Sequence, residues 1–152
     1  MRRLCVLLTP LLLFGCGRIH TLKDGHYAIV ANGVVRDDCN LAAAPGYVSG
    51  GRLVTTGDDL HFDYDAFGIQ LAGSYLDPSI AAPDKMELDG TAANVDVHIG
   101  GQDCLLSLLT LHLDGTTVDG QDFKGTLSVK TDLTRPETCL CQLWVTYDAH
   151  AQ

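Results

Sequence analysis

The stretch DLHFDYDAFGIQLAGSY, residues 59–75, decides the fold class of this 152-residue chain. In its first half, Leu60, Phe62 and Tyr64 alternate with polar residues, which is the period of a β-strand with one buried and one solvated face. The residues Ala66-Phe67-Gly68 then turn the chain into a second strand over 69–75. The stretch therefore predicts an antiparallel hairpin rather than a helix.

The same pattern recurs on both sides of this hairpin, with glycine, aspartate and proline between the segments. Further strands are predicted at 26–36, 52–56, 86–99, 103–113, 123–130 and 139–148. Gly33 predicts a bulge and Gly90 a break, while Asp114-Gly115 and Asp119-Gly120 are expected to flank a turn. Eight strands with short links predict an all-β, up-and-down antiparallel meander, closed as a barrel or folded as a sandwich.

The leucine-rich segment 103–113 is the one ambiguous element. Leucine favours helices, and eleven residues would suffice for one. Because glycine turns bound the segment and its neighbours alternate as strands, we predict a strand that is apolar on both faces.

Four cysteines, Cys39, Cys104, Cys139 and Cys141, fall at the same end of such a meander. An even number in an exported chain predicts two disulfides. A bond between Cys139 and Cys141 would close a strained, very small ring. We therefore expect Cys39 to pair with one of these two and Cys104 with the other.

The N-terminus has the layout of a secretory leader, with Met1-Arg2-Arg3 before an uncharged apolar run over 4–14. As a helix this run rises only about 17 Å, against about 30 Å for the bilayer core, so it is too short for a permanent span. The junction Leu13-Phe14-Gly15-Cys16 resembles the lipobox of bacterial lipoproteins.

The resemblance implies that the leader, residues 1–15, is cut before Cys16. That cysteine would carry acyl chains such as palmitate and hold the protein on the bacterial cell envelope. Gly17 implies the outer membrane rather than the inner one. The expected organisation is a short tether over 16–23 and a single β domain over 24–152.

The charge of the chain limits its partners. The net charge is −9, with 10 basic and 19 acidic residues, and loss of Arg2 and Arg3 with the leader makes it −11. An acidic body repels nucleic acid and anionic headgroups, so membrane attachment is expected through the lipid alone. A basic protein or a cation is a compatible partner.

Motifs for chemistry are sparse, and we predict no catalytic residue, cofactor or metal. Cys139 and Cys141 with His98 or His112 would form a soft-metal site if the disulfides were absent. The acidic residues between Asp59 and Asp65 are expected to be a solvated strand face. No nucleophile elbow, P-loop or H-E-x-x-H occurs.

Trp144, the only tryptophan, makes both faces of the last strand apolar. The expectation is either a strand with one face in the core and a partly covered outer face, or Trp144 at a barrel mouth or as an anchor at an interface. Leu106 and Leu108 pose the same question: they are expected either to be covered within the domain or to contact another subunit or the membrane surface.

The leading hypothesis is a non-enzymatic, lipid-anchored binding domain for a small apolar molecule inside a barrel or for an envelope protein. In strand count and disulfides it looks like the lipocalin-type and lysozyme-inhibitor-type barrels of envelope lipoproteins. The second hypothesis is an envelope hydrolase, which requires a serine or a carboxylate pair near a histidine in a cleft. The third is metal binding.

Overall fold

The computed structural model describes residues 21–38, 40–44, 46–76, 84–99 and 101–152. This part of the chain forms nine strands and two short 3-10 turns, and it contains no helix long and apolar enough to cross a membrane. The elements are, in chain order, β1 (Gly25–Asp37), β2 (Gly51–Thr56), β3 (Asp59–Tyr64), η1 (Ala66–Gly68), β4 (Ile69–Tyr75), β5 (Lys85–Ala92), β6 (Val95–Ile99), β7 (Gln102–Thr117), β8 (Asp122–Arg135), η2 (Glu137–Cys139) and β9 (Gln142–Ala151).

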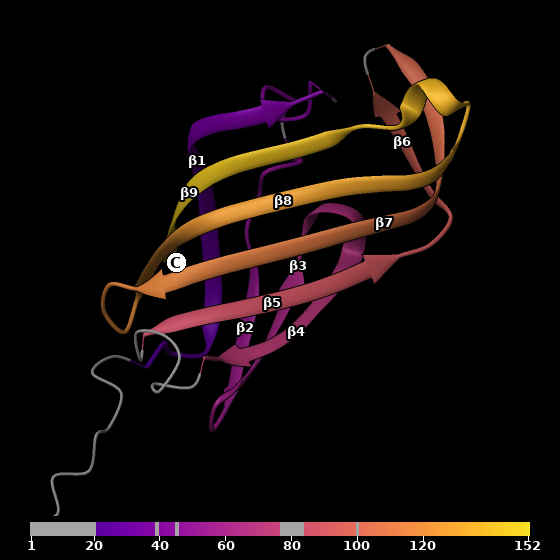
Figure 1. The fold of residues 1–152 in the computed structure, drawn as a ribbon. Helices are drawn as coiled ribbons and strands as arrows, with labels where there is room; N and C mark the ends of the chain where they lie inside the picture. Colours follow the sequence, from indigo (N-terminus) through magenta and orange to yellow (C-terminus); the bar gives the residue numbers. More distant parts are fainter. Residues whose placement is uncertain (1–20, 39, 45, 77–83, 100) are drawn as a thin grey trace, which may run out of the picture.

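The strands form one antiparallel meander that returns to its start. Neighbouring strands pair in the order β5-β4-β3-β2-β1-β9-β8-β7-β6, and β5 also pairs with β7, so the pairings form a ring. Figure 1 shows the long, curved β7, β8 and β9 running side by side, with the shorter β2, β3 and β4 across from them. The predicted all-β, antiparallel up-and-down topology is confirmed.

The predicted number of eight strands differs from the observed nine because the segment 86–99 is divided. Its two parts, β5 and β6, face β7 in one unbroken register, from Lys85 opposite Thr116 to Ile99 opposite Gln102. The division lies at Asn94, whose φ of 54° interrupts the extended backbone, and not at Gly90 as predicted. Gly33 does mark a register shift in β1, as expected.

The leucine-rich segment is a strand, but its buried face changes along its length. Leu106 and Leu109 are both buried although they are three residues apart, so the alternation changes phase at Ser107-Leu108. This position lies opposite the interruption at Asn94. The sequence of this segment is apolar on both faces because each half of the strand buries a different face. Leu106 therefore belongs to the core and not to an exposed patch.

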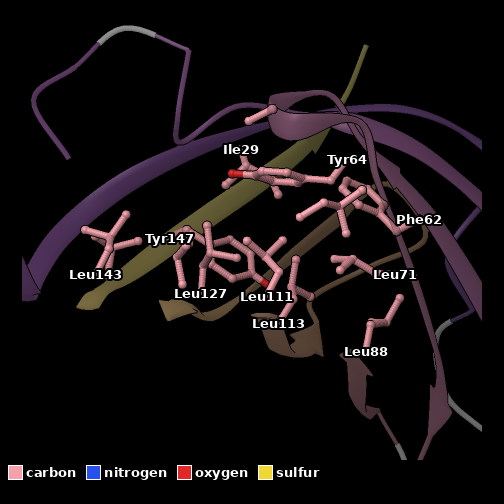
Figure 2. Close-up of a cluster of buried hydrophobic side chains, with 14 of the residues drawn as sticks. Ile29, Phe62, Tyr64, Leu71, Leu88, Leu111, Leu113, Leu127, Leu143 and Tyr147 are labelled. Carbon is pink, nitrogen blue, oxygen red and sulfur yellow. The ribbon is translucent and has the colours of Figure 1, made fainter. Parts of the chain in front are cut away.

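Large side chains fill the interior of the ring. Phe62, Leu88, Leu111 and Tyr147, from strands on all sides, have at most 1% of their surface exposed. Figure 2 shows such side chains pointing toward one another between the strands. Burying apolar surface at about 25 cal/mol per Å² is the main force that closes the ring.

Buried tyrosines satisfy their hydroxyls with backbone carbonyls. Tyr147 donates to the carbonyl of Asp114 at 2.9 Å, and Tyr64 donates to that of Tyr47 at 2.8 Å. Burial of the phenol raises the pKa of Tyr64 to about 12 and that of Tyr147 well above its ordinary value, because the charged phenolate is poorly solvated there.

A disulfide joins Cys104 at the start of β7 to Cys139 in η2, with 5.9 Å between their Cα atoms. It confirms one of the two predicted bridges. The other expected member, Cys39, lies outside the described residues, as does Cys16, while Cys141 is also disulfide-bonded.

The two ends of the ring differ. At the end where β1 begins, the backbone N–H of Leu22 donates to the Tyr75 hydroxyl at 3.0 Å, and that of Lys23 donates to the Gly120 carbonyl at 3.0 Å. We call this the anchor end. The β7–β8 turn lies here, over 118–121, whereas Asp114-Gly115, expected to flank the turn, is inside β7. The strand β6 lies at the opposite end (Figure 1), and so does the disulfide, because Cys104 is at the start of β7.

Candidate functional site

The interior of the ring offers no ligand cavity around its central side chains. Leu71, Leu111, Leu127 and Tyr147 are 0% exposed, which means that no space beside them admits a water molecule. A small apolar molecule would have to displace these side chains, and protein cores resist such repacking. Functional features among the described residues are therefore sought on the outer surface.

Exposed apolar side chains gather on β1 and β9. Trp144 is 46% exposed, and Val30, Val34 and Val35 are each more than half exposed. The cross-strand neighbours of Trp144 are Arg36 on β1 and Ser128 on β8. Leu143, Val145 and Tyr147 are buried in the core, and Trp144 lies on the outer face of the same strand.

Trp144 borders a shallow groove that we call the Trp144 groove. Its first part, about 250 Å³, is lined by Ser128, Val129, Lys130, Gln142, Leu143 and Trp144. Its second part, about 240 Å³, shares Lys130 and Gln142 and continues toward η2, where Arg36, Asp38, Thr131, Asp132, Leu140 and Cys141 line it. The groove thus combines an indole ring with polar groups of both charges.

Each cation of the groove is paired with a carboxylate. Arg36 donates from Nε to Asp38 and from Nη1 to the Gln142 side chain, both at 2.7 Å. The hydrogen bond that Arg36 donates to the Asp38 carboxylate raises the pKa of Arg36. Lys130 Nζ lies 3.1 Å from Asp132 Oδ2. These pairs are largely solvent-exposed and contribute little to stability, so their groups remain available to a ligand.

A row of polar residues approaches the groove from the other side. His112 on β7 lies directly opposite Asp89 on β5 and directly opposite Ser128 on β8. His112 Nδ1 is 2.7 Å from Asp89 Oδ1. The same row continues to Trp144 and Arg36, so that an aspartate, a histidine and a serine lead into the groove in that order.

A depression of about 650 Å³ lies at the β6–β7 hairpin, between Tyr47 and Asp103. We favour the smaller groove as the site, because it contains the exposed indole of Trp144. His98 Nδ1 lies 2.8 Å from Asp103 Oδ1, and the Tyr47 hydroxyl donates to the His98 carbonyl at 3.4 Å. Asp103 is almost fully exposed and has an ordinary surface environment.

The soft-metal alternative is wrong in its predicted form, because Cys139 is bonded to Cys104 and Cys141 is not a free thiol. No group of three potential metal ligands occurs in the described part of the chain. Asp59, His61 and Asp63 are exposed along β3, as expected for a solvated face.

Sequence reasoning did not identify Asp89, His112 and Ser128 as a group. They lie on three strands and are separated by 23 and 16 residues, so no local motif connects them. Only the pairing register of the predicted strands could have shown that these three residues lie side by side.

No protein-family model, curated protein or solved structure matches this chain.

Proposed function

We propose that the protein is a lipid-anchored lipoprotein of the bacterial cell envelope that binds an envelope protein through the Trp144 groove. The observation that carries this proposal is the exposed Trp144 beside Arg36, on a sheet where the neighbouring strand β1 also exposes Val30, Val34 and Val35. Tryptophan and arginine are enriched among the residues that dominate binding energy at protein interfaces.

We also propose that the ring of strands is a small closed barrel that acts as a rigid support, not as a container. The buried interior supports this reading over binding of a small apolar molecule inside. A filled barrel presents its outer side chains with little conformational freedom, which lowers the entropic cost of association.

The position of the groove suits a protein anchored by a lipid at Cys16. Leu22 and Lys23 are hydrogen-bonded at the anchor end, so the lipid would lie near that end. Along β9, Trp144 is seven residues from Ala151 at the anchor end, or about 23 Å at strand spacing. The groove would therefore be directed away from the membrane surface, toward proteins of the envelope.

The chemistry of the groove defines the partner. Its first part accepts one apolar or aromatic side chain against the indole of Trp144, and its paired charges offer donors and acceptors at the rim. The net charge of −11 expected after loss of the leader favours a basic protein, since opposite charges accelerate association.

Site-specific photocrosslinking in the native bacterium tests the binding proposal. A photoreactive phenylalanine derivative replaces Trp144 in one strain and Val118, an exposed valine at the anchor end, in a control strain. We expect one discrete protein adduct from position 144 that is absent from position 118. Purified partner should then shift Trp144 fluorescence to the blue, and Arg36→Ala should weaken that binding. Equal adducts at both positions, or none at 144, would refute the proposal.

The lipid anchor has a separate test. The intact mass of protein extracted from membranes should correspond to residues 16–152 plus acyl chains on Cys16. A Cys16→Ala variant should leave the membrane fraction. Recovery of wild-type protein that still begins with Met1 would refute the anchor.

A further inference from the structure

We propose that Ser128, His112 and Asp89 form an acyl-transfer site that hydrolyses small carboxylic esters bound in the Trp144 groove. This activity goes beyond the binding function proposed above, and the ester would occupy the same groove as the protein partner. It rests on the cross-strand register, on one hydrogen bond and on the groove beside the serine.

His112 is held in the orientation that a general base requires. Its Nδ1 lies 2.7 Å from Asp89 Oδ1, which favours the tautomer with a proton on Nδ1 and a lone pair on Nε2. In serine hydrolases the aspartate acts on the histidine in this way. With Nδ1 bonded to Asp89 on β5, Nε2 is the ring nitrogen left to accept a proton.

Ser128 is the residue directly opposite His112 on β8. Side chains directly opposite in an antiparallel pair have Cβ atoms about 4.5–5.5 Å apart. The site requires the Ser128 hydroxyl to turn toward the His112 imidazole, which needs only a change of rotamer about the Cα–Cβ bond. Because residues at such positions are fixed by the sheet, the arrangement does not depend on a mobile loop.

The arrangement is particular to His112 among the histidine–aspartate pairs that the structure describes. Four such pairs occur, at His26, His98, His112 and His150. The cross-strand neighbours of the other three histidines include no serine: they are Arg52 for His26, Asp103 for His98, and Ala28 with Asp122 for His150. His112 also has the least exposed side chain of the four, at 37%.

The groove supplies the remaining parts of the site. Ser128, Lys130, Gln142 and Trp144 occupy two neighbouring cross-strand pairs of β8 and β9 and line the same 250 Å³ space. An ester seated there packs its apolar part on Trp144. The Lys130 ammonium and the Gln142 amide are donors for the negative charge that develops on the carbonyl oxygen. The volume limits the substrate to a small ester.

The reaction proceeds in two steps. The Ser128 oxygen attacks the carbonyl carbon, its proton passes to His112 Nε2, and the carbonyl electron pair moves onto oxygen. Collapse of this intermediate breaks the ester bond, and the leaving alkoxide takes the proton from His112. Water then attacks the acyl-serine, with His112 accepting and returning a proton, and this releases the carboxylic acid and restores Ser128.

A fluorophosphonate probe on the full-length protein in detergent tests the inference. We expect one phosphonyl group on the peptide that contains Ser128, and hydrolysis of p-nitrophenyl acetate by the same preparation. Ser128→Ala should abolish both. Asp89→Asn should lower both at least tenfold, because the imidazole loses its orientation. Ser74→Ala, a serine substitution on the outer side of β4 away from any histidine pair, should leave both unchanged.

Each contrary result overturns the inference. Absence of probe on Ser128 in folded protein does so, as does ester hydrolysis that persists in Ser128→Ala and disappears in His112→Ala, since the imidazole would then act alone. Photocrosslinking at position 144 is unaffected by these outcomes. A failure of the catalytic inference can therefore be distinguished from a failure of the proposed binding function.

Discussion

Replacing Thr131 by valine should destabilise the protein by about 2 kcal/mol, because one buried hydroxyl joins β8 to the corner between η2 and β9. Thr131 is 3% exposed. Its Oγ1 accepts a hydrogen bond from the Cys141 N–H at 2.8 Å and donates to the Cys139 carbonyl at 3.0 Å. Valine has nearly the same shape, so packing is preserved while both bonds are lost.

The size of this loss of stability follows from the groups that lose their hydrogen-bond partner. The Cys141 N–H becomes a buried donor without a partner, which costs about 1–3 kcal/mol, and the donated bond is worth about 1 kcal/mol. Burial of the new methyl group offsets about 0.8 kcal/mol of this loss of stability. The expected net loss of about 2 kcal/mol corresponds to a fall of about 1 M in the urea midpoint for a protein of this size.

Urea unfolding of the oxidised protein, followed by Trp144 fluorescence, measures this loss. Thr131→Ser is the matched control, because it keeps the hydroxyl and removes one methyl group, and it should cost about half as much. If Thr131→Val unfolds within about 0.5 kcal/mol of wild type, or if serine is as destabilising as valine, the hydroxyl does not hold this corner.

Three further predictions concern the core, the tyrosines and the loop after β1. Leu111→Ala should cost about 2–5 kcal/mol in urea unfolding because the cavity cannot collapse in a filled ring, and Leu108→Ala, partly exposed on the same strand, should cost clearly less; equal costs would contradict the filled interior. Stability should fall as the pH rises from 10 to 12, because Tyr64 keeps its proton in the folded state up to a pKa of about 12 while the unfolded chain loses it near 10. Each pH unit is worth about 1.4 kcal/mol for that group, and circular dichroism with tyrosinate absorbance should show ionisation together with unfolding rather than before it. Asp37→Ala should cost about 1 kcal/mol in thermal unfolding, since its carboxylate accepts the N–H groups of Leu41 and Ala42 at 3.0 Å each; Asp37→Asn, which keeps one acceptor oxygen, should cost less.

The sequence by itself determined the strands. Alternation such as Leu60, Phe62, Tyr64 is a local property with a period of two, and it needs no knowledge of the neighbouring strand. The position of Cys104 and Cys139 at one end also followed, because antiparallel strands with short links reverse direction at each turn. The change of buried face at Ser107-Leu108 could not be predicted from the sequence. The leucine pairs on either side of Ser107 each place one leucine on each face of the strand, so the sequence does not show which face is buried.

Only the tertiary structure decided the candidate site. Asp89, His112 and Ser128 meet through the register of three strands, and a shift of one residue in any pairing would turn a member to the opposite face. Register depends on how the whole ring closes around its core, which is a sum over contacts between residues far apart in the chain. The exposure of Trp144 was undecided in sequence for the same reason: both faces of β9 are apolar there, and closure of the ring assigns Leu143 and Val145 to the interior and Trp144 to the surface.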